Sequence, residues 1–223
     1  LSSRLGIPIS FREELLHSAG IPNATVFPMP VNLGATWNLT LAEQVFRAIA
    51  FEARAGGVDY GFAPVLQVAT NALWGRGQES FGADPTLVTN FADVVTRSLQ
   101  GNPVNTSLPS TFNASRHVVC QGKHFFAYGA MAHDTVPVDL SERTLREVYL
   151  KPWRSWIRDS GGLAVMATHP PVNGCPMVAN RRYLTDVLRG DLGGENITVA
   201  SDNGDVNHLF STWKVASSVE LAG

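Results

Sequence analysis

Residues 197–204 read Ile-Thr-Val-Ala-Ser-Asp-Asn-Gly, and this stretch indicates both a strand and a candidate site residue. Three β-branched residues lead into small ones, which is typical of a short buried strand. The run ends on Asp202, with Gly204 in the turn behind it. A carboxylate at the tip of a strand is held rigidly while its oxygens stay reachable, as a nucleophile requires. The sequence Ser-Asp-Asn-Gly is also typical of a turn in which Asp202 caps the next helix, so both interpretations stay open here.

The composition describes one sizeable domain, expected to span residues 1–223. Of the 223 residues, 44% are hydrophobic and 16% are charged, and the net charge is -2. Because no basic run occurs, nucleic acid and anionic membrane surfaces are poor partners. No apolar run approaches the roughly 20 residues that span a bilayer, so no membrane span is expected. The start at Leu1, without a Met or a signal-like segment, is expected for a processed chain or a piece of a longer one.

Asn-X-Ser/Thr sequons point to the secretory pathway. They begin at Asn23, Asn38, Asn105, Asn113 and Asn196. All five lie in stretches expected to be loops or element edges, where a glycan can be attached. We therefore expect a secreted glycoprotein. In that compartment Cys120 and Cys175 could pair, although both could equally be buried free thiols.

Strand-like and helical stretches alternate along the chain. The strand-like runs cover residues 6–11, 25–28, 58–68, 117–122, 163–167 and 197–202. Helices are expected after a capping box at Thr40–Glu43, after the cap Asp84-Pro85, over 141–159 with a bend near Pro152, around 184–188 and over 209–221. Residues 101–116 are expected to be a surface excursion. This alternation predicts an α/β fold with a parallel sheet and right-handed crossovers.

Chemically active side chains fall at the same end of these strands. Glu14, Arg76, Lys123, His124, His169 and Asp202 each lie at or just past a strand's carboxyl end. In a (β/α)8 TIM-type barrel that end is the catalytic face. The pattern therefore favours a barrel enzyme. About six strands are visible where a closed barrel needs eight, so the barrel is expected to be incomplete.

Several blocks of sequence resemble one enzyme family. They are RLGIPISFREELLHS, FAPVLQVATNALWGRGQESFGADP, KHFFAYG, VDLSERTLREVYLKPW, VNGCPMVANRRYLTDVLRG and VASDNG, in that order. From about residue 4 to about residue 206 the chain resembles the N-terminal barrel domain of glycoside hydrolase family 3, the β-glucosidase and β-xylosidase family. The Gly-Arg-Gly-Gln-Glu motif is more similar to the xylosidase branch of the family than to the glucosidase branch.

The resemblance implies roles for the residues at the strand ends. It makes Asp202 the nucleophile of a retaining mechanism and Glu14, Arg76, Lys123 and His124 ligands of sugar hydroxyls. His169, placed with the substrate-binding residues, stands where the family usually has a tyrosine beside the nucleophile. Other interpretations are open. Glu13 could take the site role in place of Glu14, and Arg76 could be a structural ion-pair partner of Glu79. Lys123 and His124 could be packing residues. Trp74, Phe125 and Phe126 are expected in the core rather than as sugar platforms.

The family also implies an acid/base carboxyl from a second domain or chain, since no residue here takes that role. We expect a secreted retaining hydrolase of β-linked glucosides or xylosides, with a β-linked oligosaccharide or glycoside as partner. No cofactor is expected, and no metal-ligand cluster or phosphate loop appears. The alternative is a catalytically silent relative that binds sugar or serves as a structural extracellular glycoprotein. It draws support from His169 and from Asn203, where the family often has Trp, Tyr or Cys. An N-acetylhexosaminidase is disfavoured, because Phe126-Ala-Tyr-Gly replaces the loop with that branch's acid/base His.

Overall fold

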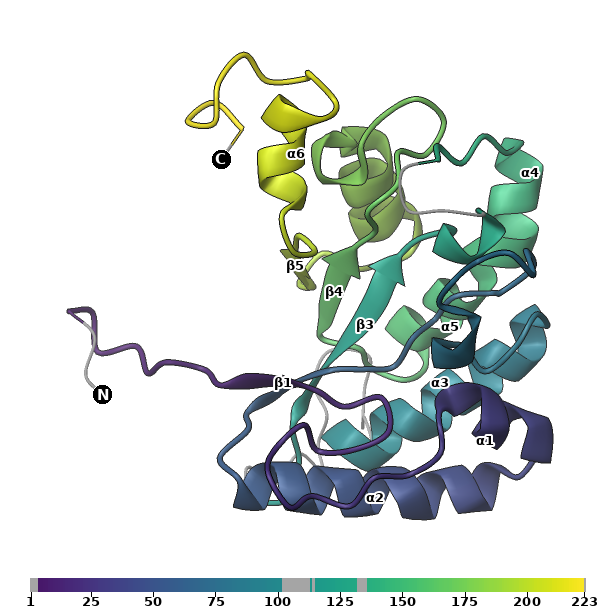
Figure 1. Cartoon of the computed structure of the whole chain (residues 1–223), viewed down its shortest axis with the longest axis vertical. Helices are drawn as coiled ribbons and strands as arrows, with labels where there is room; N and C mark the ends of the chain where they lie inside the picture. The colour runs from purple at the N-terminus through teal and green to yellow at the C-terminus, as the bar shows by residue number, and fades with distance from the viewer. Residues whose placement is uncertain (1–3, 102–112, 114, 132–135, 223) are drawn as a thin grey trace.

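The computed structural model describes residues 4–101, 113, 115–131 and 136–222 (Figure 1). Its centre is a parallel sheet with the strands in chain order. The strands are β1 (Arg12–Glu14), β2 (Tyr60–Phe62), β3 (Val119–Phe125), β4 (Ala164–Ala167) and β5 (Thr198–Ala200). The parallel α/β sheet is confirmed. It has five strands rather than the expected six, and within the described residues it does not close into a barrel.

Helices connect the strands. The α-helices are α1 (Pro30–Thr36), α2 (Leu39–Ala55), α3 (Pro85–Gln100), α4 (Glu142–Thr144), α5 (Lys151–Arg158) and α6 (Asp205–Ser211). The 3₁₀ turns are η1 (Gly77–Glu79), η2 (Tyr128–Ala130) and η4 (Met177–Ala179), and the π-helical segments are η3 (Leu145–Tyr149) and η5 (Arg182–Asp191). α2 packs on α3 and α3 packs on α5. In Figure 1 these helices lie below and to the right of the strands, whereas α6 follows β5 at the opposite edge.

The helix starts show which sequence signals hold. The Asp84 carboxylate accepts a hydrogen bond from the Leu87 amide at 2.7 Å, and Pro85 follows, as predicted for the start of α3. The capping box at Thr40 is wrong. α2 begins two residues earlier, at Leu39, because the Asn38 side chain is the cap and accepts from the Leu41 amide at 2.9 Å.

Two predicted strands are absent, each for a different reason. Residues 6–11 extend away from the sheet, and pairing starts only at the Phe11 carbonyl, which accepts from Asp59 and Tyr60. Residues 25–28 form a loop tied to α2, since both the amide and the hydroxyl of Thr25 donate to the carboxylate of Glu52. A strand needs a neighbouring strand for its hydrogen bonds, and neither segment has one among the described residues.

Two predicted helices also differ. The helix expected over 141–159 is divided into α4, π-helical η3 and α5, so its irregularity lies before Pro152 rather than at it. The helix expected over 209–221 is α6, which ends at Ser211. Beyond it the chain forms turns and bends in which Val215, Val219 and Leu221 are exposed, so the apolar face expected for a helix is not buried there. Most of the expected excursion over 101–116 lies outside the described residues.

The core fills the space between the sheet and the helices. Trp74, Phe125 and Phe126 are buried in it, as expected. Trp153 and Trp156 of α5 pack edge to face with ring centroids 5.8 Å apart, and each is at most 1% exposed. Aromatic side chains of this size supply much of the apolar area that folding buries. The sheet is therefore held firmly beneath the residues at its carboxyl edge.

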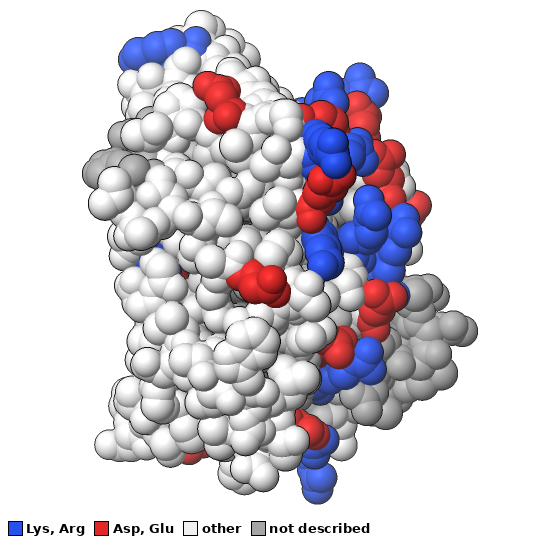
Figure 2. Space-filling model, turned by 90° about the vertical axis from the view of Figure 1, so that its right-hand side faces the viewer, with Lys and Arg blue, Asp and Glu red and all other residues white. Residues whose placement is uncertain are grey.

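The remaining sequence expectations concern charge, membrane and cysteines. Figure 2 shows Lys and Arg beside Asp and Glu in one band, with an almost uncharged surface next to it, so neither sign forms a patch of its own in this view. No helix in the described ranges is long and apolar enough to cross a membrane. Cys120 and Cys175 are free thiols, the first buried in β3 and the second partly exposed.

Candidate functional site

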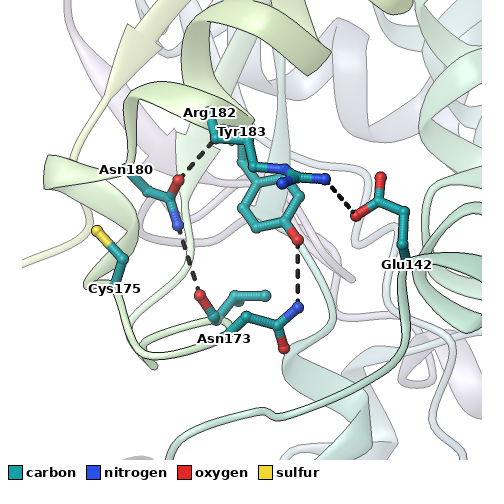
Figure 3. A pocket seen from close by; sticks show the side chains of 7 residues that line it. Glu142, Asn173, Cys175, Asn180, Arg182 and Tyr183 are labelled. Carbon is teal, nitrogen blue, oxygen red and sulfur yellow. Dashed lines mark hydrogen bonds and ion pairs between the residues drawn. The ribbon is translucent and has the colours of Figure 1, made fainter.

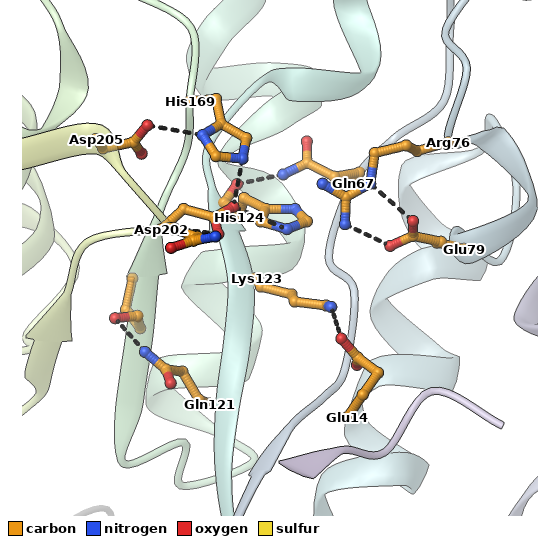
Figure 4. A network of polar contacts seen from close by, with 12 residues as sticks. Glu14, Gln67, Arg76, Glu79, Gln121, Lys123, His124, His169, Asp202 and Asp205 are labelled. Atoms are coloured by element: carbon orange, nitrogen blue, oxygen red, sulfur yellow. Dashed lines mark hydrogen bonds and ion pairs between the residues drawn. The ribbon is translucent and has the colours of Figure 1, made fainter. Parts of the chain in front are cut away.

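The carboxyl edge of the sheet brings the predicted site residues together (Figure 4). Glu14 ends β1, Lys123 and His124 lie near the end of β3, and His169 and Asp202 follow β4 and β5 by two residues each. Arg76 lies in the loop after β2, directly before η1. Parallel strands place their carboxyl ends at one edge, which is why residues more than 180 positions apart meet here.

Asp202 lies between two histidines. Its Oδ2 is 2.9 Å from Nε2 of His169 and 3.4 Å from Nε2 of His124, and its side chain is 14% exposed. Its Oδ1 accepts from the Asn203 amide at 2.7 Å. Helix α6 is instead preceded by Gly204, without a side-chain cap. The capping interpretation of Asp202 is therefore wrong, and its carboxylate faces the edge of the sheet.

Asp205 is a site residue that the sequence did not reveal. It is the first residue of α6, its side chain is 4% exposed, and its Oδ1 lies 2.7 Å from Nδ1 of His169. His169 therefore has a carboxylate at each ring nitrogen. An acid three residues after Asp202 was the available signal, but at a helix start it is ordinary, since the helix dipole favours acids there.

Lys123 and Glu14 form an ion pair across the sheet. The ammonium of Lys123 contacts Oε2 of Glu14, and the two side chains are 3% and 45% exposed. Burial raises the pKa of Glu14, and the attraction of Lys123 offsets this only in part. Glu13 instead lies against Gly20. The structure thus places Glu14, not Glu13, among the residues at the edge.

Arg76 makes the ion pair with Glu79 that the sequence left open. Two guanidinium nitrogens donate to the two carboxylate oxygens, both at 2.7 Å. The guanidinium also lies over the Tyr128 ring, 5.4 Å from its centroid. Burial alone would lower the pKa of Arg76, but the hydrogen bonds that it donates to Glu79, the charge of Glu79 and the contact with Tyr128 together outweigh burial and raise the pKa. Arg76 is therefore a fixed cation at the site.

Gln67 holds the backbone of His124 and is a second site residue that the sequence did not reveal. It is 1% exposed, its amide donates to the His124 carbonyl, and its Oε1 accepts from the Gly129 amide at 3.2 Å. His124 is 1% exposed and meets the Tyr128 ring edge to face at 5.3 Å. Gln67 thus holds the backbone of His124, Tyr128 packs against its ring, and Nε2 of the ring lies 3.4 Å from Oδ2 of Asp202.

One cavity lies away from this edge. It has a volume of about 430 Å³ and is lined by Glu142, Val172, Asn173, Cys175, Asn180, Arg182 and Tyr183 (Figure 3). Its polar groups bond one another: Arg182 donates to Glu142 at 2.9 Å, and the Asn173 amide to the Tyr183 hydroxyl at 3.4 Å. No predicted site residue lines it. Across the described residues, no cluster of His, Cys, Asp and Glu has the arrangement of a metal site.

Comparisons with known proteins identify the family of the chain. The family model described as "Glycosyl hydrolase family 3 N terminal domain" matches residues 1–222. The chain belongs to glycosyl hydrolase family 3. A β-xylosidase of Formosa agariphila is 37% identical over 97% of this chain and 30% of its own length. A lysosomal β-glucosidase of Dictyostelium discoideum is 33% identical over 97% of this chain and 26% of its own.

Solved structures of family relatives share the fold. A β-glucosidase from Erythrobacter marinus matches with a TM-score of 0.87 and 33% identity, covering 99% of this chain and 28% of that one. A β-glucosidase from Listeria innocua, solved in complex with glucose, matches with a TM-score of 0.87 and 29% identity, covering 98% and 29%. This family 3 chain thus spans less than a third of the length of these relatives.

The charges at the centre of the candidate site follow from the contacts. Burial would raise the pKa of Asp202, but the contacts with His169, the nearby His124 and the Asn203 amide together outweigh burial and bring the pKa to about 2. The contacts with Asp202 and Asp205 raise the pKa of His169 to about 10. Burial, with Arg76 and Lys123 nearby, lowers the pKa of His124 well below its usual value. At neutral pH the site therefore holds a carboxylate, an imidazolium and a neutral imidazole.

These shifts predict how the stability of this family 3 chain depends on pH. A pKa of about 10 for His169, against 6.5 when unfolded, gives stability that is complete below pH 6.5 and is lost toward pH 10. Urea unfolding of the wild type and of His169→Gln, from pH 6 to 10, measures this. We expect the difference in unfolding free energy between the two to shrink as the pH rises. Other titrating groups lower the stability of both proteins alike, so their effect cancels in this difference. A difference that does not change with pH would contradict the prediction.

Proposed function

We propose that the protein is a retaining glycoside hydrolase acting on β-linked glucosides or xylosides, with Asp202 as its nucleophile. The observation that supports this most is the position of Asp202 beyond β5, partly exposed, beside the imidazole rings of His124 and His169. A pKa of about 2 keeps its carboxylate ionised at any physiological pH. A carboxylate that is ionised, fixed and reachable is what attack on an anomeric carbon requires.

The proposed reaction has two displacements. An oxygen of Asp202 attacks the anomeric carbon as the bond to the leaving oxygen breaks, and a carboxylic acid protonates that oxygen. Water, deprotonated by the same acid/base, then releases the sugar and restores the carboxylate. The configuration at the anomeric carbon is retained because it is inverted twice. The carboxylate also stabilises the positive charge that develops on the ring in each transition state.

The acid/base is proposed to come from a second domain or chain outside the described residues, which would also complete the barrel. The acids near Asp202 already have basic partners: Glu14 contacts Lys123, Glu79 contacts Arg76, and Asp205 contacts His169. We also propose that residues 1–223 form the N-terminal barrel domain of that larger assembly. The fact that the chain spans less than a third of the length of its family relatives supports this proposal.

Sugar binding is proposed to use the charged edge around Asp202. Lys123 and Arg76 supply fixed donors, Glu14 an acceptor, and His124 and His169 line the approach to Asp202. Charged donors and acceptors held in place select one pattern of sugar hydroxyls, and they bind more strongly when the ring distorts toward the transition state. Family relatives described as β-xylosidase and β-glucosidase support a glucoside or xyloside as substrate.

Covalent trapping tests the proposed function. The full-length protein is treated with activity-based fluoro-sugars of the gluco and xylo series, and the adduct is located by mass spectrometry of peptides. We expect one sugar on Asp202, no adduct on Asp202→Asn, and normal labelling of the control Asp186→Asn, whose side chain is exposed on η5. A protein that binds sugar and forms no adduct would instead be the catalytically silent relative.

We also propose that the protein is a secreted glycoprotein. Asn23, Asn38, Asn113 and Asn196 are exposed, and Asn105 lies outside the described residues. Asn38 caps α2 through its oxygen, which leaves its amide nitrogen available for a glycan. Peptide-N-glycosidase treatment of material from the native source should lower the mass by several glycans. An unchanged mass would refute secretion through the glycosylating pathway.

A further inference from the structure

His169 is held at both ring nitrogens by carboxylates from one short stretch of chain. Nε2 lies 2.9 Å from Oδ2 of Asp202, and Nδ1 lies 2.7 Å from Oδ1 of Asp205. A neutral imidazole carries a single N–H, so one of these contacts would set a lone pair against a carboxylate. An imidazolium donates at both nitrogens, and it is the form that satisfies both contacts.

Asp205 starts α6, where an acid is common, but an acid at a helix start is usually exposed and this one is not. It is 3% exposed, and its Oδ2 is buried without a hydrogen-bond partner among the described residues. Burying a carboxylate is costly unless a charged partner compensates for lost hydration. His169 is the nearest basic group, at 2.7 Å, whereas Nδ1 of the half-exposed His208 lies 3.6 Å from the same oxygen.

The other charged and titratable groups around His169 come from three elements. β3 contributes His124, whose ring centroid is 6.4 Å away, and Lys123 beside it. The loop after β2 contributes Arg76, and η2 contributes Tyr128, whose ring centroid is 5.9 Å from that of His169. The cations Lys123 and Arg76 are paired with other carboxylates, Lys123 with Glu14 and Arg76 with Glu79. The two aspartates are the close contacts.

We propose that Asp205 and His169 are positioning residues for the nucleophile: Asp205 fixes His169 as an imidazolium, and His169 in turn holds Oδ2 of Asp202 in place. This arrangement keeps Asp202 ionised despite its partial burial and sets the direction of its carboxylate. The pairing stands on the geometry alone, while its catalytic use rests on the proposed function. Neither residue bonds the substrate in this role, so Asp205 acts only through His169.

Histidine NMR of the full-length protein tests the pairing without turnover. Ring ¹⁵N signals of the chain's six histidines are followed with pH, and that of His169 is assigned by its loss in His169→Gln. We expect His169 to stay doubly protonated to about pH 9 in the wild type. In Asp205→Asn its titration should fall by about 1–3 pH units, because one of two opposite charges is gone. Asp186→Asn should leave it unchanged. Titration near pH 6.5 in the wild type, or no shift in Asp205→Asn, would overturn the proposal.

The pH profile of kcat/KM tests the consequence for the nucleophile. Its acid limb reports protonation of Asp202 in the free enzyme, so His169→Gln should move that limb to higher pH by about 1–3 units. Asp205→Asn should leave the acid limb near its wild-type position, because His169 is still protonated in acid. A normal profile in His169→Gln would refute the positioning role while the glycosidase assignment stands. A doubly protonated His169 in a protein that no fluoro-sugar labels would support the pairing and refute the proposed function.

Discussion

Asp202→Asn is expected to lower kcat/KM on aryl β-glucosides and β-xylosides by about 10⁴-fold or more in the full-length protein. The amide cannot form the glycosyl ester, and it cannot stabilise the positive charge that develops on the sugar. The Asp202 side chain is only 14% exposed, but asparagine has the same shape and fits the same space, so the fold should be kept. Steady-state kinetics and circular dichroism check both expectations.

A chemical rescue separates loss of the nucleophile from general damage. In Asp202→Gly, added azide can enter the space of the missing carboxylate and attack the anomeric carbon in one displacement. One displacement inverts the configuration, so the product should be the α-glycosyl azide. Asp186→Asn is the matched control, because its side chain is exposed on η5, and it should keep wild-type activity. An active Asp202→Asn variant would contradict the assignment of the nucleophile.

Lys123→Met should lower kcat/KM by about 10- to 100-fold, because a hydrogen bond to a charged group contributes about 1.5–3 kcal/mol. The side chain is 3% exposed and its ammonium meets Glu14 at the edge of the sheet. Methionine keeps most of the volume of the stem but supplies no donor to a sugar hydroxyl. Kinetics with the two aryl glycosides measure the effect, and Lys151→Met, at an exposed position on α5, should leave kcat/KM unchanged.

A double-mutant cycle with Glu14→Gln shows whether the pair acts as a unit. If Lys123 and Glu14 orient each other, the double variant should lose less than the sum of the single losses, expressed as free energies. Burial already raises the pKa of Glu14, and loss of Lys123 removes the attraction that opposes this. Lys123→Met should therefore leave Glu14 more protonated. A variant that is less stable but has normal kcat/KM would make Lys123 a packing residue.

Local signals were reliable where one residue decides the structure. Asp84 followed by Pro85 starts α3, because a carboxylate that reaches the Leu87 amide and a preset proline dihedral act within one turn. The signal failed at α2, where Asn38 and Thr40 are both residue types that cap well and the structure uses Asn38. The strand predicted at residues 25–28 is absent for a related reason. Its strand-like sequence is hydrogen-bonded to Glu52 through Thr25, not to a neighbouring strand.

The sequence by itself determined the alternation of strands and helices and the side of the sheet on which the candidate residues lie. Each of those features depends on period, caps and chain direction, which are local. Only the tertiary structure decided which side chains touch: that Arg76 pairs with Glu79, that Glu14 rather than Glu13 meets Lys123, and that Asp205 holds His169. Arg76 and Glu79 are three residues apart, so there the structure chose between two interpretations that the sequence had left open. The other contacts depend on distances of a few ångströms between segments far apart in the sequence, and so do the charges of Asp202 and His169, which no local pattern encodes.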